Sequence, residues 1–116
     1  MIMLPFKKND IHIDLTLMKD HFQSEEEKDD FLEWFTLALS NARITNQLRS
    51  VETCYICNEF VTLKSTGKKI PRFEFRIPYG GPDLIVRSAI LHLVSVHNLI
   101  PDKIVIEALE KLKPRN

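Results

Sequence analysis

Apolar and polar residues alternate strictly through the segment IHIDLTL at residues 11–17. The four apolar side chains of this segment therefore share one face, and His12, Asp14 and Thr16 share the other. A period of two residues over seven positions predicts a strand with one buried face. On that reading His12 is an ordinary surface histidine.

The next segment has helical periodicity. Ser24 and Glu27 form an S-x-x-E capping box, with three acidic residues in the first helical turn. Apolar residues then recur at helical spacing, which predicts an amphipathic helix over residues 24–41: they are Phe31, Leu32, Trp34, Phe35, Ala38 and Leu39. Trp34 and Phe35 are candidate partner-binding residues, because tryptophan is enriched at interface hot spots.

A β-hairpin is expected after the cysteine pair of the chain. NEFVTLK (58–64) and IPRFEFRIP (70–78) have strand character, and the STGKK segment between them predicts a turn, with Gly67 able to adopt a positive φ. YGGPD then breaks the sheet, and Pro82 and Asp83 suit the first two positions of a helix.

Two helices are expected to complete the chain. The first runs over residues 82–97 and is apolar nearly all round, which predicts a central position. The second is amphipathic and begins at Pro101 and Asp102. The predicted fold class is α+β: an N-terminal strand and amphipathic helix, a zinc-knuckle hairpin and two C-terminal helices, with a ββα core like that of a zinc finger. We interpret residues 1–116 as a single domain, with a strand and helix part at 1–50 and a Cys2His2 zinc module at 51–116.

Four residues carry candidate metal chemistry. Cys54 and Cys57 are the only cysteines and form a C-x2-C pair, and His92 and His97 form an H-x4-H pair. Zinc prefers such ligands in a tetrahedron, and two thiolates cancel the charge of the ion. Taken singly, the cysteines could be small buried apolar residues and His92 a hydrogen-bonded core histidine. Their joint order on a knuckle, a hairpin and a helix favours a structural zinc ion.

The helix that carries the histidines poses a geometric difficulty. Five residues of ideal α-helix leave two side chains about 140° apart, too wide for one metal ion. We therefore expect the helix to loosen before His97, as Asn98 and Pro101 indicate. His92 shares a polar stripe with Ser88 and Ser95, so a serine hydroxyl or a backbone carbonyl could hold its second ring nitrogen.

Catalytic alternatives fit the pattern less well. A redox CxxC needs a helix after its first cysteine, whereas a strand is expected here. Zinc deaminases place H-x-E before P-C-x-x-C, the reverse of the order in this chain. Four protein ligands would leave zinc no open position for water, so we expect no enzymatic activity.

Composition and charge indicate in which compartment the protein works and whether it associates with a membrane. The chain is 44% hydrophobic, but no window approaches the roughly 18 apolar residues of a membrane helix. The opening MIMLPFKKND does not fit a signal peptide, so we expect a cytoplasmic protein with reduced thiols and no membrane association. Residues 1–42 carry 4 basic and 9 acidic side chains, a net charge of −5, and residues 43–116 carry 12 and 7, a net charge of +5.

The segment HLVSVHNLIPD resembles the end of the prokaryotic Ros-type zinc finger. In that family a histidine pair closes a helix and a Leu-x-Pro-acid step opens the next one; the matching residues here are His92, His97, Leu99, Pro101 and Asp102. The insertion before His92 is much longer in this chain, and no Gly-x-x-Phe follows Cys57. More broadly, residues 54–109 resemble small bacterial proteins with a CxxC, a hairpin and an H-x4-H-x3-P ending. The resemblance implies zinc binding.

Two functions fit these observations. The first is a zinc-stabilised binding protein, such as an adaptor, an inhibitor or an immunity-type protein, that acts on an unidentified protein partner. The second is a Ros-like regulator that binds nucleic acid through the basic residues of the predicted hairpin, which are Lys64, Lys68, Lys69, Arg72 and Arg76. The apolar central helix and a pI near 6.9 weigh against the second, because reading a major groove needs polar side chains and a basic surface.

Overall fold

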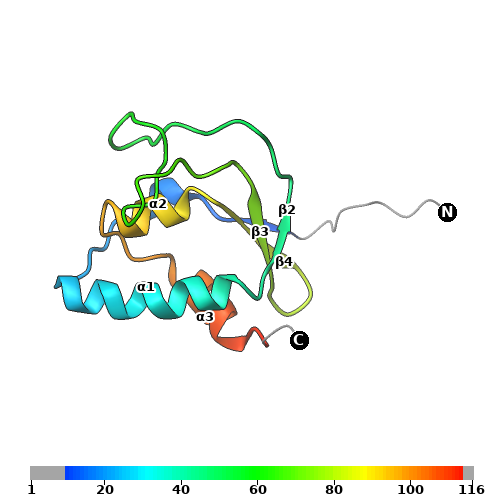
Figure 1. Cartoon of the computed structure of the whole chain (residues 1–116). Helices are drawn as coiled ribbons and strands as arrows, with labels where there is room; N and C mark the ends of the chain where they lie inside the picture. Colours follow the sequence, from blue (N-terminus) through cyan, green and yellow to red (C-terminus); the bar gives the residue numbers. More distant parts are fainter. Residues whose placement is uncertain (1–9, 114–116) are drawn as a thin grey trace.

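The computed structural model describes residues 10–113, which form a mixed four-stranded sheet and three α-helices (Figure 1). The α+β class predicted from the sequence is confirmed. The opening segment MIMLPFKKND, which does not fit a signal peptide, lies outside the described residues apart from Asp10.

The sheet combines strands from both halves of the chain in the order β1-β4-β3-β2. Strand β1 (Ile11–His12) runs parallel to β4 (Asp83–Arg87), and β4 pairs antiparallel with β3 (Glu74–Pro78). Strand β2 (Arg43–Thr45) pairs antiparallel with the other edge of β3. One sheet therefore joins residues before and after the cysteine pair.

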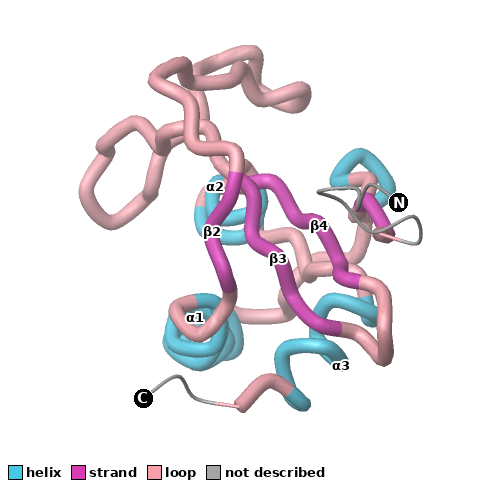
Figure 2. Tube along the Cα trace, turned by 90° about the vertical axis from the view of Figure 1, so that its right-hand side faces the viewer, coloured by secondary structure: helices cyan, strands magenta, loops and turns pink. Residues whose placement is uncertain are grey.

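The helices cover one side of this sheet and one end of it. Figures 1 and 2 show α1 (Glu25–Leu39) and α3 (Lys103–Lys111) on the same side of the molecule, and α3 contacts β3. The short α2 (Ile90–Ser95) follows β4 and contacts α1. No helix within residues 10–113 is long and apolar enough to cross a membrane.

Two helix predictions are confirmed, together with their caps. The Ser24 hydroxyl accepts a hydrogen bond from the Glu27 amide at 3.1 Å, which satisfies a free donor at the start of α1. The Asp102 carboxylate accepts one from the Ile104 amide at 3.1 Å at the start of α3. Local capping chemistry was sufficient to place both helix starts.

The long N-terminal strand predicted over residues 11–17 is wrong beyond His12. The Asp14 carboxylate accepts hydrogen bonds from the Thr16 amide at 3.0 Å and the Thr16 hydroxyl at 2.6 Å. These bonds start a 3-10 turn, η1 (Leu15–Leu17), which competes with the extended backbone. Leu15 is consequently buried while Leu17 is 67% exposed, so the two do not share a face.

The predicted hairpin and the predicted long helix are also wrong. Residues 58–64 form only isolated bridges, Thr53 with Phe60 and Thr62 with Lys69. The hairpin of the structure pairs β3 with β4, the segment that was expected to be helical. Strand β4 is buried on both faces between β1 and β3, and such an apolar run has no strand periodicity to distinguish it from a buried helix.

Pro82 and Asp83 therefore do not start a helix. They end the tight turn that joins β3 to β4, in which the Tyr79 amide donates to the Pro82 carbonyl at 2.9 Å. Gly80 and Gly81 have φ values of 62° and 120° in this turn, which glycine adopts without a steric penalty. The YGGPD segment is a break, as expected, but it joins two strands.

Candidate metal centre

The two cysteines lie on a tight knuckle, residues 54–58, that its own hydrogen bonds hold. The Asn58 amide donates to the Cys54 carbonyl at 2.9 Å, and the Cys54 amide donates to the Glu59 carbonyl at 2.8 Å. The Ile56 amide lies 3.4 Å from the Cys54 sulfur and donates to it. Asn58 closes the knuckle with a φ of 59°, a left-handed conformation that asparagine tolerates better than most residues. The backbone thus turns both sulfurs in one direction.

His92 occupies the middle of α2 and is only 2% exposed. Its Nε2 atom lies 3.6 Å from the Cys57 sulfur. Its Nδ1 atom lies 2.8 Å from the Thr62 carbonyl oxygen and 2.9 Å from the Thr62 amide nitrogen. When Nε2 binds a metal ion, Nδ1 carries the proton and donates to the carbonyl, an arrangement that orients metal-bound histidines.

The second-nitrogen partner of His92 is thus the Thr62 carbonyl, one of the two options expected. Ser88, the other candidate on the polar stripe, has different partners. Its hydroxyl donates to the Pro71 carbonyl at 2.9 Å and accepts from the Phe73 amide at 3.2 Å. Because Thr62 belongs to the loop that follows the knuckle, that loop is bound directly to His92 of α2.

His97 lies two residues after the end of α2, as the geometric argument from the sequence required. The helix ends at Ser95, and Asn98 takes a left-handed φ of 60°. This departure from the helix brings the His97 ring to within 5.0 Å of the His92 ring, measured between centroids. The His97 Nε2 atom lies 3.4 Å from the Cys54 sulfur.

The four side chains together form a cluster that could hold a metal ion. Their ligand atoms, two sulfurs and two ring nitrogens, all lie within 4.8 Å of one another. Tetrahedral zinc, with bonds of about 2.3 Å to sulfur and about 2.0 Å to nitrogen, separates sulfur from nitrogen by about 3.6 Å. The two contacts of 3.4 Å and 3.6 Å match that separation. The structure thus brings together the four predicted residues, which are Cys54, Cys57, His92 and His97.

Burial favours the form of His97 that binds metal. Burial lowers the pKa of His97 below its usual value, and the neighbouring His92 lowers it further. Metal coordination requires an unprotonated ring nitrogen, so this shift reduces competition from protons. Within the knuckle, burial raises the pKa of Tyr55, and the negative charges of Cys54 and Asp14 add to that effect.

A buried lysine supports the His97 turn from outside the cluster. Lys28 of α1 is 2% exposed, and its ammonium group donates to the Asn98 side-chain oxygen at 2.7 Å and to the Ser95 carbonyl at 3.3 Å. It also forms an ion pair with Glu25 at 3.2 Å. Lys28 therefore binds a free carbonyl at the end of α2 and fixes the residue after His97. The sequence holds one signal of this role, a single lysine within the acidic run EEEKDD.

The predicted partner-binding pair is not a surface patch. Phe35 is fully buried in the core, so this residue has no side-chain surface to offer a partner, and its assignment is corrected here. Its ring stacks on Phe31 at 5.1 Å between centroids. Trp34 is half-buried and packs against the same core. The aromatic stripe of α1 is thus mainly structural.

The five basic residues of the expected hairpin lie on the loop after the knuckle, just before β3 and on β3 itself. Arg76 lies on β3, where it forms ion pairs with Asp10 at 2.9 Å and Asp83 at 3.4 Å. The Lys69 ammonium lies 4.5 Å from the centre of the Phe60 ring. Lys64 and Lys68 belong to the loop after the knuckle, and Arg72 precedes β3; Lys68 and Arg72 are exposed. Arg76 is thus ion-paired within the protein, and the assignment of the five basic residues as nucleic-acid contacts stays a prediction.

Comparisons with protein-family models, with curated proteins and with solved structures find no match for this chain.

Proposed function

We propose that the protein is a small zinc-stabilised binding protein that acts through protein–protein contacts, as an adaptor, an inhibitor or an immunity-type protein. The observation that carries the proposal is the convergence of two cysteine sulfurs and two histidine nitrogens on one point. In this proposal zinc is structural, the protein is not an enzyme, and it works in the cytoplasm, where its thiols stay reduced.

The ligand set supports zinc as the metal. Two sulfur and two nitrogen ligands in a tetrahedron are typical of zinc, whereas calcium and magnesium prefer oxygen ligands. Two thiolates neutralise the charge of the ion, which suits a site in which Cys54 and His92 are buried. The resemblance of residues 92–102 to the end of a Ros-type finger adds support.

The same ligand set supports a structural role. Four protein ligands complete the coordination of zinc and leave no position for a substrate or a reactive water. The knuckle and the loop that follows it form only isolated bridges, so they depend on other contacts for order. Zinc would join this irregular segment to α2 through Cys54, Cys57 and the two histidines.

The surface of the knuckle supports protein contacts. Tyr55, Ile56 and Phe60 are 47%, 44% and 49% exposed on and beside it. Neighbouring exposed apolar side chains of this kind are more typical of an interaction surface than of a face that meets only water. A rigid zinc knuckle would hold them without the entropic cost of ordering a loop on binding.

Native mass spectrometry of the protein, purified gently from its own host without chelator, tests this proposal. The expected result is one zinc ion per chain and a co-purifying protein in fixed stoichiometry. Zinc with bound nucleic acid would favour the regulator instead. A folded chain that carries no metal would refute the zinc assignment. Cys57→Ser should abolish zinc binding, whereas His12→Ala, which changes an exposed histidine outside the cluster, should leave it unchanged.

A further inference from the structure

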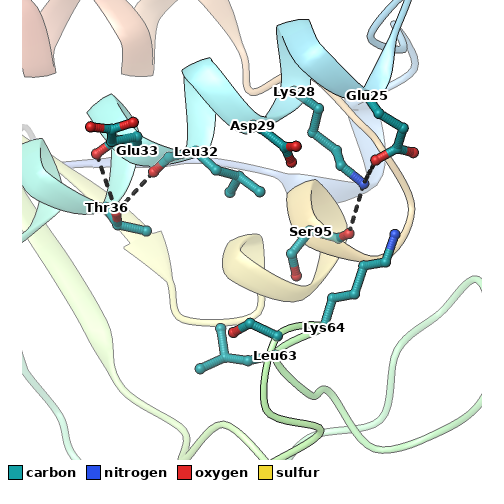
Figure 3. A pocket seen from close by; sticks show the side chains of 10 residues that line it. Glu25, Lys28, Asp29, Leu32, Glu33, Thr36, Leu63, Lys64 and Ser95 are labelled. Atoms are coloured by element: carbon teal, nitrogen blue, oxygen red, sulfur yellow. Dashed lines mark hydrogen bonds and ion pairs between the residues drawn. The ribbon is translucent and has the colours of Figure 1, made fainter.

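A cleft of about 500 Å³ separates α1 from the loop that follows the metal centre (Figure 3). One wall is a continuous face of α1 from Glu25 to Thr36. The facing wall is formed by residues 63–65 of the loop, and Ser95 of α2 lines the floor. Eleven helical steps at about 1.5 Å each make this wall about 16 Å long, the length of about five extended residues.

The α1 wall carries two carboxylates that pair with no cation among the described residues. Asp29 and Glu33 are exposed, and within residues 10–113 neither forms an ion pair. Glu25 is the exception, because it pairs with Lys28. The ammonium group of Lys28 also donates to the Ser95 carbonyl and the Asn98 side-chain oxygen, so its partners are groups other than Asp29 and Glu33. Two carboxylates therefore remain available along the cleft.

Between the charges the cleft is apolar. Leu32 from α1 and Leu63 from the loop both line it and are half-buried. Figure 3 shows Leu32 extending from α1 into the space between the two walls, with Asp29 beside it on the helix. An aliphatic floor beside a carboxylate rim matches the side chains of lysine and arginine, which bury an apolar stem and keep a charged end at the surface.

Ser95 is a second and independent sign of a binding site. It is 7% exposed, and its hydroxyl oxygen has no hydrogen-bond partner within the described residues. Buried hydroxyl groups are nearly always paired, and an unpaired one is costly. In Figure 3 Ser95 lies between Lys28 and the Leu63–Lys64 wall, at the floor of the cleft.

We propose that this cleft binds a short basic segment of a partner protein, with a lysine or arginine stem between Leu32 and Leu63 and its charged end at Asp29 and Glu33. The inference rests on the proposed function as a protein-binding module and locates the contact. It differs from the aromatic contact expected from the sequence, because the cleft lies on another face of α1.

Lys64 determines where the cation can bind. Figure 3 shows its side chain extending from the loop toward the Glu25 and Lys28 end of the cleft. A second cation would be repelled there, so the basic residue is directed to the Asp29 and Glu33 end. Lys64→Met should therefore strengthen the binding of a basic segment, a sign opposite to that expected for loss of the carboxylates.

The test uses the zinc-loaded full chain and an acetylated, amidated peptide, Ala-Lys-Leu-Lys-Ala, with Ala-Glu-Leu-Glu-Ala as the reverse-charge probe. Binding is followed by amide chemical-shift changes. We expect the lysine peptide to shift amides of Asp29, Leu32, Leu63 and Ser95 saturably, and the glutamate peptide to bind far more weakly. Asp29→Asn combined with Glu33→Gln should weaken the lysine peptide by about tenfold, the equivalent of two partly desolvated ion pairs.

A matched control has the same change in net charge. Glu26→Gln combined with Asp30→Asn removes two exposed carboxylates of α1 that do not line the cleft. It should change peptide affinity less than about twofold, because general attraction to an exposed helix is screened by salt. Equal weakening by both double variants, shifts confined to the knuckle, or no saturable shift up to about 5 mM peptide would overturn the inference.

The same variants separate this inference from the proposed function. If the natural complex found by native mass spectrometry is unaffected by Asp29→Asn with Glu33→Gln, the cleft assignment fails while protein binding stands. If no protein co-purifies but the peptide behaves as expected, the cleft stands as a basic-peptide site and the adaptor proposal fails.

Discussion

Replacement of Lys28 by methionine tests whether α1 supports the metal centre. Methionine matches the length of the aliphatic stem of lysine and keeps the apolar packing, but it removes the ammonium group. The substitution leaves the Ser95 carbonyl and the Asn98 side-chain oxygen without their buried donor. None of the four residues of the Cys2His2 cluster is altered. Any effect on metal binding would therefore pass through the turn that holds His97.

The magnitude follows from the three contacts of the ammonium group. The 2.7 Å bond to Asn98 is a short charge-assisted bond, worth about 1.5–3 kcal/mol, and the 3.3 Å bond to Ser95 is weaker, about 1 kcal/mol. The pair with Glu25 adds little, because that carboxylate is 69% exposed. Removal of a buried charge returns part of the loss. We expect the free energy of unfolding to fall by about 2–3 kcal/mol.

Part of this loss should appear as weaker zinc binding. Asn98 is held by Lys28 in a left-handed conformation directly after His97. Residues that orient metal ligands from outside typically change metal affinity by about 10–100-fold. Zinc competition against a chromophoric chelator measures that change, and urea unfolding with and without zinc measures stability.

Glu25→Gln is the matched control, since it removes only the exposed ion pair and should change stability by less than about 0.5 kcal/mol. Wild-type zinc affinity in Lys28→Met would refute the proposed support of His97. An equal loss of stability with and without zinc would also count against that support, because it would place the whole effect of Lys28 on packing.

Three further outcomes are expected. Cys54→Ser should abolish tight zinc binding, which is worth about 10–16 kcal/mol in zinc-finger peptides. Hydrogen exchange should then show lost protection in residues 54–63, while β3 and β4 stay protected. Full protection of the knuckle in this variant would contradict the prediction. The pKa of His97 is lowered from its ordinary value of 6.5, so the metal-free protein should keep the contribution of His97 to its stability above about pH 6.5 and lose it as the pH falls toward the folded-state pKa. In His97→Gln, stability should depend less steeply on pH. Urea unfolding of the two proteins between pH 5 and 8 measures this dependence. Asn58→Gly should preserve or raise thermal stability, and Asn58→Val should lower it by about 1–3 kcal/mol, because its φ of 59° strains a β-branched residue; equal melting temperatures would refute this.

The Cys2His2 cluster was predictable because ligand chemistry depends on few residues. The cysteine spacing predicted a knuckle. Two side chains five residues apart on an ideal helix lie about 140° apart, so one metal ion can bind both histidines only if α2 ends before His97, as it does. The caps of α1 and α3 were predictable for the same local reason, since a serine or aspartate side chain binds an amide two or three residues away.

The central part of the sheet was not predictable from local pattern. Residues 83–87 follow a proline and contain an unbroken apolar run, which suits a buried helix equally well. The strand form is decided by partners far along the chain, because Ile11 pairs with Leu84 and Phe75 with Val86. Lys28 was missed for a related reason: the residues it binds are 67 and 70 positions away.

The Cys2His2 cluster and the cleft are connected by only a few residues of chain. Thr62 binds the Nδ1 atom of His92, and the next two residues, Leu63 and Lys64, form the wall that faces α1. On the other side, Lys28 binds the turn after His97 and also lines the cleft. Both walls are therefore positioned against histidines of the same cluster. A structural zinc ion at this place would fix the width of the cleft, which gives a metal without catalytic chemistry a direct part in recognition.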